Sequence, residues 1–418
     1  MSLPVRHLSV LQNWDCQGCG NCCREYHISV SEEERRRILS QGWEKDPAIA
    51  GLPLFVHSGP PWSRRHRLNH HKNGACIFLS SENRCKIHER FGEAAKPFPC
   101  RLYPFVLVPV GDHFRAGLRF ACPSAAANRG SPLADHHKQL TGFVPELERQ
   151  AQCAGEMIPA PRLQWGQAVD WPEIQRFIQA IENILKDHSD SFERRMRKCL
   201  AFAKLCRKAH FEKIKGSRLT EFLDLITMGL DAEVPADPSV LPAPGSIGRI
   251  LFRQVLAVYI RKDQGPLRSE IRGRPALIWA AWRFARGTGL VPRLHGWLPS
   301  TTFECVEEAR GSLSPEAEAI LERYYLMKVS SLQFCGAACF RFSFWEGLES
   351  LALTLPVILW ITRVMADVSR NEAVERAIAM VDRNFGFNPI LGMQRQRLAL
   401  RILSNRAELE KLIGWYSR

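Results

Sequence analysis

A run of four cysteines near the start of the chain carries the strongest chemical signal in the sequence. Cys16, Cys19, Cys22 and Cys23 follow a C-x2-C-x2-C-C pattern. Thiolates spaced by two residues can converge on one soft metal centre, and the glycines between them let backbone N–H groups turn toward the sulfur atoms. Adjacent side chains of an extended segment point to opposite sides, so we expect Cys22 and Cys23 to serve different sites, or one of them not to be a ligand.

Four further cysteines follow at wider spacing: Cys76, Cys85, Cys100 and Cys122. The first two flank an expected hairpin, and the last two stand beside prolines, which stiffen a loop that presents a sulfur atom. The eight cysteines divide into two groups of four, so two four-thiolate sites are feasible. Both zinc and iron-sulfur clusters accept four thiolates, and the spacing with interleaved glycines favours an iron-sulfur cluster over zinc.

Three histidines lie close to these cysteines in the sequence, namely His70, His71 and His88. Because the thiolates already suffice as ligands, we expect these rings to lie at the surface or to support the ligands rather than to bind the metal.

Composition and charge restrict the class of protein. The chain has 418 residues, of which 45% are hydrophobic and 24% charged, which excludes wholesale disorder and allows two or three domains. Lysine and arginine number 57 against 43 acidic residues, and this excess of +14 favours acidic partners. Fourteen cysteines without a hydrophobic leader predict a cytoplasmic protein with metal or redox chemistry rather than disulfides.

The longest apolar run, from Leu351 to Ile361, is interrupted by Thr354 and Pro356. It is shorter than the roughly 20 residues that cross a bilayer, so we expect a buried helix and no membrane span.

Residues 1–130 are expected to form an irregular, metal-organised domain with short β-hairpins. Ser31 and Glu34 form a capping-box pattern, which predicts a helix that ends before Gly42, after a short strand at 27–30. Proline, glycine and charged residues predict a loop from Asp46 to Lys72, and the segment 73–88 is typical of a turn, a short strand and a return. The clearest hairpin spans 105–120, with its turn at Gly111 and Asp112.

Residues 131–418 are expected to form a helical domain, which makes the fold mainly α. Apolar residues recur at helical spacing, and a proline-rich linker around 231–245 separates two helical groups. The predicted helices span 172–187, 191–213, 219–229, 247–262, 276–286, 315–334, 344–368, 372–384 and 391–415, and the longer ones are expected to be broken.

Several other features have simpler interpretations. Cys335 and Cys339 would share a helix face, where small residues favour close packing. Arg194, Arg195, Arg197 and Lys198 predict a basic, solvated helix face. Trp279, Trp282 and Phe284 predict core packing with basic residues on the outer side.

The N-terminal region resembles the YkgJ-type cysteine-cluster family, described as a zinc- or iron-chelating domain. The resemblance covers roughly residues 14–125 and implies metal binding at the eight named cysteines. It rests on the Cys16–Cys23 run, Cys76-Ile-Phe-Leu, Cys85-Lys-Ile-His-Glu-Arg-Phe, Lys96-Pro-Phe-Pro-Cys100-Arg-Leu-Tyr-Pro and Cys122-Pro123.

The helical half is similar to the flagellin lysine-N-methylase group in total length and in the segment from Tyr324 through Phe334. This second resemblance implies transfer of methyl groups to protein lysines, with S-adenosylmethionine as cofactor.

Three classes of function remain open. The first is a cytosolic metal-binding enzyme, either a protein-lysine N-methyltransferase or an iron-sulfur oxidoreductase, with an acidic protein substrate and a polar pocket between the two halves. The second is a metallochaperone for iron or zinc, which requires exposed, incompletely coordinated cysteines. The third is a structural zinc module that presents a basic surface to nucleic acid. We favour the first for its metal content, and the sequence identifies no catalytic residue.

Overall fold

The described residues of the cysteine-rich part form two small three-stranded sheets. The computed structural model describes residues 3–6, 12–59, 64–151, 158–211, 213–261 and 273–418. One sheet has the order β1-β6-β5, with β1 (Val5–Arg6) parallel to β6 (His113–Leu118), and β6 antiparallel to β5 (Phe105–Val110). The other is antiparallel, in the order β2 (Ser29–Val30), β4 (Arg65–Leu68) and β3 (Phe55–Ser58). The predicted hairpin at 105–120 is confirmed.

Short helices connect these strands. The capping box predicted at Ser31 is present, because its hydroxyl accepts the Glu34 N–H and the Glu34 carboxylate accepts the Ser31 N–H. The helices of this part are α1 (Asn21–Glu25), α2 (Glu32–Leu39), η1 (Trp43–Lys45), α3 (Lys86–Phe91), η3 (Glu93–Ala95), α4 (Phe98–Leu102), α5 (Pro123–Ala126) and η4 (Leu133–His136).

The predicted loop from Asp46 to Lys72 is wrong, because β3 and β4 lie within it. Their pairing with β2 is a contact distant in sequence, which the local proline and glycine content conceals. The expected short strand and return around the turn at residue 80 are reduced to one isolated bridge, Leu79 with Cys85, and the chain then continues into α3.

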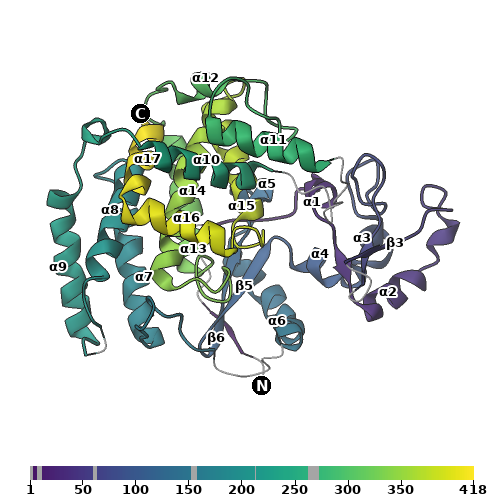
Figure 1. Cartoon of the computed structure of the whole chain (residues 1–418). Coiled ribbons are helices and arrows are strands. Elements are labelled where there is room, and N and C mark those ends of the chain that lie inside the picture. The colour runs from purple at the N-terminus through teal and green to yellow at the C-terminus, as the bar shows by residue number, and fades with distance from the viewer. Residues whose placement is uncertain (1–2, 7–11, 60–63, 152–157, 212, 262–272) are drawn as a thin grey trace.

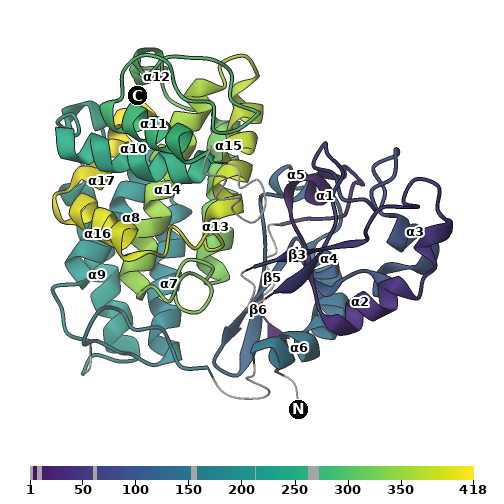
Figure 2. The same cartoon turned by 45° about the vertical axis from the view of Figure 1, so that its right-hand side comes forward.

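The rest of the chain is helical, and the predicted mainly α fold is confirmed. Figures 1 and 2 show these helices packed beside the cysteine-rich part, with β5 and β6 next to α7 and α13. The helices are α6 (His137–Ala151), α7 (Trp171–Leu185), α8 (Phe192–Cys206), α9 (Ser217–Glu233), η5 (Pro238–Val240), α10 (Ser246–Ile260), α11 (Gly273–Arg286), α12 (Phe303–Glu307), α13 (Pro315–Ser330), α14 (Phe344–Val364), α15 (Arg370–Asn384), α16 (Gln394–Asn405) and α17 (Glu408–Ser417).

Helix α14 is the apolar segment that the sequence places in the interior. By length and composition it is the one helix in the described ranges that could cross a membrane, yet 94% of its apolar window is buried inside the protein. Its Trp360 is fully buried, which confirms the expected core helix.

In the described part of the chain, the buried apolar residues form two hydrophobic cores. The large one joins the helices to the β1-β6-β5 sheet through residues such as Phe105 and Phe114, whereas the small one, from Val30 to Ile87, packs the second sheet against α2 and α3. The domain boundary near residue 130 stays a prediction, and the first sheet shares its core with the helices on the other side of it.

Two expectations about surfaces are wrong. Arg195, Arg197 and Lys198 on α8 are at most 4% exposed and pair with carboxylates, among them Glu322 with Arg195 and Glu193 with Arg197, so they form no solvated basic face. On α11, by contrast, Trp279 and Trp282 are about half exposed, at 53% and 52%, while Phe284 alone of the three is buried. The helix turns its two indole rings outward, with Arg283 over Trp279.

Candidate metal centre

The first cysteine run passes from a loop into helix α1. Cys16 and Cys19 are exposed on the loop, and Cys22 and Cys23 are half-buried on the helix. Gly20 precedes the helix in the left-handed region, at φ 66°, and a side chain there would also press against Arg24. Glycine adopts this conformation at little cost. The turn that places the cysteine run against Leu79 and Asn83 therefore depends on Gly20.

Cys22 and Cys23 do not point to opposite sides as expected. The segment is helical rather than extended, and a hydrogen bond between the two thiol groups is the largest cause that raises the pKa of Cys22, followed by burial. The two side chains therefore belong to one neighbourhood.

Three more thiols gather beside Cys22, each carried by a different segment. The backbone N–H of Cys76 donates to the carbonyl oxygen of Cys23 at 2.8 Å, which fixes the 70s loop against α1. Cys85 pairs with Leu79 in an isolated β-bridge and occupies the N-cap position of α3, while Cys100 lies on α4. Burial first, and then the charges of Cys85 and Cys22, together raise the pKa of Cys76 to about 12.

Cys100 completes this group. Its pKa is raised well above the ordinary value, first by burial and then by the charges of Cys76, Cys85 and Cys22. Four cysteines far apart in the sequence are thus close enough to affect one another electrostatically. We call Cys22, Cys76, Cys85 and Cys100 the inner thiol group.

A second, looser association joins Cys19 to Cys122. Cys122 is buried at the N-terminus of α5, and burial, with a smaller contribution from the Cys19 thiolate, raises its pKa. Cys16 is exposed on the same loop as Cys19.

The inner thiol group has the right donor atoms for zinc or iron, but its sulfur atoms are not close enough together to coordinate one metal ion. Within the described ranges, no three Cys, His, Asp or Glu side chains converge closely enough to hold a metal ion. Soft thiolate donors suit both metals, and binding would require each thiol to lose its proton and the side chains to close in. The eight predicted ligands remain a prediction, and the four inner ones fit the group best.

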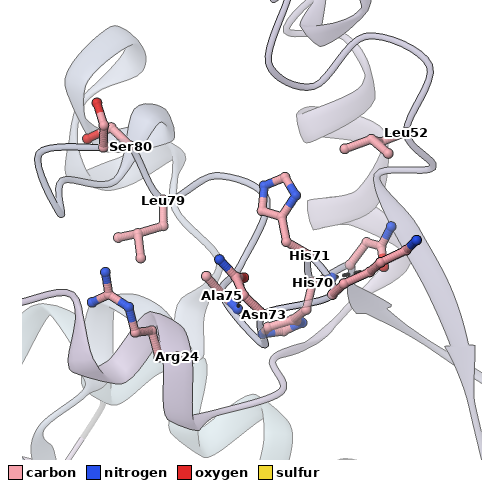
Figure 3. Close-up of a pocket in the computed structure, with 11 residues that line it drawn as sticks. Arg24, Leu52, His70, His71, Asn73, Ala75, Leu79 and Ser80 are labelled. Carbon is pink, nitrogen blue, oxygen red and sulfur yellow. Dashed lines mark hydrogen bonds between the residues drawn. The ribbon is translucent and has the colours of Figure 1, made fainter.

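The histidines near the cysteines differ in their surroundings. Both ring nitrogens of His70 lie 3.2 Å from carbonyl oxygens, those of Leu68 and Tyr26, and burial lowers the pKa of its ring. His71 lines a pocket of about 800 Å³ (Figure 3). This pocket lies beside the inner thiol group in the chain, because its lining residue Ala75 directly precedes Cys76. His88 is exposed on α3.

A buried polar contact that the sequence does not reveal ties this region to the helices. Glu25 at the end of α1 pairs with Arg383 of α15 at 3.0 Å, and the carboxylate of Asp382 accepts the Ala121 N–H at 3.0 Å. Lys328 of α13 is fully buried and pairs with Asp382. No spacing in the sequence could have identified these partners, since each comes from a different element.

The remaining cysteines lie apart from the candidate centre. Cys199 and Cys206 are fully buried in the helical core. Cys335 and Cys339 are also buried, but they lie in turns between α13 and α14 and not on the predicted helix. Cys153 lies outside the described residues.

Comparison with known families agrees with this placement. Residues 15–123 match the CxxCxxCC family model, whose description reads "Putative zinc- or iron-chelating domain". The chain carries a CxxCxxCC domain. The domain includes all eight predicted ligand cysteines and covers both sheets apart from β1. Searches of the curated proteins and of the solved structures found no match to the chain.

Proposed function

We propose that this protein holds an iron-sulfur cluster at the inner thiol group of its CxxCxxCC domain. The observation that carries the proposal is that Cys22, Cys76, Cys85 and Cys100, from four separate segments, lie close enough to influence the pKa values of Cys76 and Cys100, with Cys76 buried and the other three half-buried. Four thiolates with left-handed glycines nearby are the ligand environment that such clusters use. When bound, the cluster would supply one-electron redox chemistry, and the chain would supply its ligands and exclude water.

The proposal also covers the compartment, the partner and the reaction of the protein. We place the protein in the cytoplasm, where thiols stay reduced, and we expect an acidic protein as substrate or partner because of the excess positive charge. Protein-lysine methyl transfer rests on the resemblance of the helical half alone, and no residue in the described part of the chain adds support to it.

A metal-handling role is the second candidate, and one observation favours it. Cys16 and Cys19 are exposed to solvent at the edge of the domain, where a partner protein could reach them. A transient carrier of iron or zinc needs such accessible thiolates, whereas a structural site encloses its ligands.

Metal and acid-labile sulfide analysis of the anaerobically purified full chain tests the proposal. We expect iron with sulfide and visible charge-transfer absorption in the wild type, both lost in Cys100→Ser. Cys199→Ser is the matched control, because that thiol is buried in the helical core, and it should retain the cluster.

Other results would separate the alternatives. Zinc without sulfide, lost in Cys100→Ser, would overturn the cluster and indicate a structural or transferable zinc site. Neither metal in the wild type, combined with uptake of added metal that Cys19→Ser abolishes, would overturn the resident centre and favour metal handling.

A further inference from the structure

The pocket beside the inner thiol group has a composition that selects one charge of ligand. It measures about 800 Å³, within the range of roughly 300–1,000 Å³ that small-molecule sites occupy. Among the described residues, its lining contains arginine, lysine, two histidines, two asparagines and two serines but no aspartate or glutamate: Arg24, Leu52, Asn69, His70, His71, Lys72, Asn73, Ala75, Leu79, Ser80 and Ser81. A pocket with cations and without carboxylates attracts anions and repels cations.

The guanidinium of Arg24 is held in place without being neutralised. It donates to the carbonyl oxygen of Cys19 at 3.3 Å and to the side-chain oxygen of Asn83, both of which are uncharged. Among the described residues, neither Arg24 nor Lys72 forms an ion pair. Figure 3 shows Arg24 and His71 on different sides of the same space.

Neutral groups complete the lining. The side-chain oxygen of Asn73 accepts the Ala75 N–H at 3.0 Å, which leaves the amide NH2 as a donor. Leu52, Leu79 and Ala75 supply apolar surface, which would suit the carbon framework of an organic ligand.

We propose that this pocket binds a small organic anion that carries phosphate or carboxylate groups. Charge-assisted hydrogen bonds from Arg24 and Lys72 would hold its charged groups. No described cysteine lines the pocket, so the ligand would lie beside the candidate metal centre and not on it. The inference goes beyond the proposed function and does not depend on which metal is bound.

Isothermal titration calorimetry of the purified full chain at low ionic strength provides the test, with AMP and citrate as probes. We expect at least one probe to bind, and roughly tenfold weaker binding in both Arg24→Gln and Lys72→Gln, because each loses one charge-assisted bond. Lys45→Gln is the control: this lysine is exposed in the same domain but outside the pocket, and its removal should change nothing.

The outcomes are decisive. Binding of AMP alone would identify a phosphate ligand, and binding of citrate alone would identify a carboxylate ligand. Binding of both would show that the pocket selects ligands by negative charge. The proposal would be overturned if neither probe bound, or if Lys45→Gln weakened binding as much as Arg24→Gln and Lys72→Gln do. Arg24 also joins the Cys19 loop to Asn83, so if its variant fails to fold, Lys72→Gln alone decides. Metal content, measured on each variant, reports separately on the inner thiol group.

Discussion

The carboxylate of Asp46 shows how a single buried charge can position a cysteine-bearing segment. It accepts the Ala48 N–H at 3.0 Å, and it pairs with Lys86 at 3.1 Å and with Arg90 at 2.6 Å, both on the helix that begins directly after Cys85. Burial acts to raise the pKa of Asp46, but the bond from Ala48 and the charge of Lys86 outweigh it and lower the pKa.

This arrangement predicts a pH dependence for Asp46→Asn. A carboxyl group whose pKa is lower in the folded state stabilises the fold above its unfolded pKa of about 3.9, and the effect is lost as the pH falls through the folded value. We expect the variant to be less stable by about 1–2 kcal/mol at pH 7, and the difference to shrink below pH ~4. Urea unfolding of both proteins across this pH range is the measurement. Glu44→Gln, an exposed neighbour, should show no such trend, and a constant difference at all pH values would contradict the argument.

Helix α2 acts as a fixed support for the helix that carries Cys100. One oxygen of Glu34 accepts the Ser31 N–H at 2.8 Å to complete the capping box, and the other accepts the Phe98 N–H at the start of α4 at 2.5 Å. Glu34 thus connects the N-terminus of α2 to the segment that delivers a cysteine to the inner thiol group.

Three variants separate the two roles of Glu34. Ser31→Ala weakens the cap alone and should cost about 1 kcal/mol without changing metal content. Glu34→Gln can still cap but lacks the second acceptor, and Glu34→Ala loses both bonds, so both should release metal faster under a chelator than wild type does. Unfolding and metal-release rates measure the two effects independently. Faster release from Ser31→Ala than from Glu34→Gln would refute the assignment.

The predictable elements of this chain are those that short-range rules determine. The capping box at Ser31, the hairpin around Gly111 and the long amphipathic helices depend on neighbours within a few residues, and the sequence predicts them. Helix α6 was not predicted, because Gly142 and Pro145 lie inside it and lower its helix propensity. Strands β3 and β4 depend on pairing with β2, a contact far away in the sequence.

The candidate site divides in the same way. The identity of the cysteines follows from spacing and type, and the family match covers all eight. Which of them gather could not be predicted, because Cys76, Cys85 and Cys100 reach Cys22 through tertiary packing alone. The buried pairing of Lys198 with Asp190 could not be predicted either, because both side chains look like ordinary surface residues in the sequence.

At the scale of the whole molecule, the two parts are joined by close packing as well as by charge. Gly117 on β6 lies directly against the turn after α13, where a Cβ would overlap the side-chain nitrogen of Gln333 and lie 2.7 Å from the hydroxyl of Ser331. Gln333 in turn accepts a hydrogen bond from the buried Lys328 at 2.7 Å. A methyl group at this position would therefore disturb both the contact between the parts and the buried lysine.

Gly117→Ala should for this reason destabilise the whole protein by about 1–3 kcal/mol, as overpacking does in other cores. Its control is Gly142→Ala, because no atom lies within 4 Å of the position that this Cβ would occupy in α6. This control should increase the free energy of unfolding by about 0.5–1 kcal/mol through higher helix propensity. Because the large core includes both β6 and the helices, we expect the near-ultraviolet signal, which reports the packing of aromatic side chains, and the far-ultraviolet helical signal to shift together in Gly117→Ala. If the two signals separated, with the helices unaffected, the sheet would be an independent unit and the shared core would not couple the two parts.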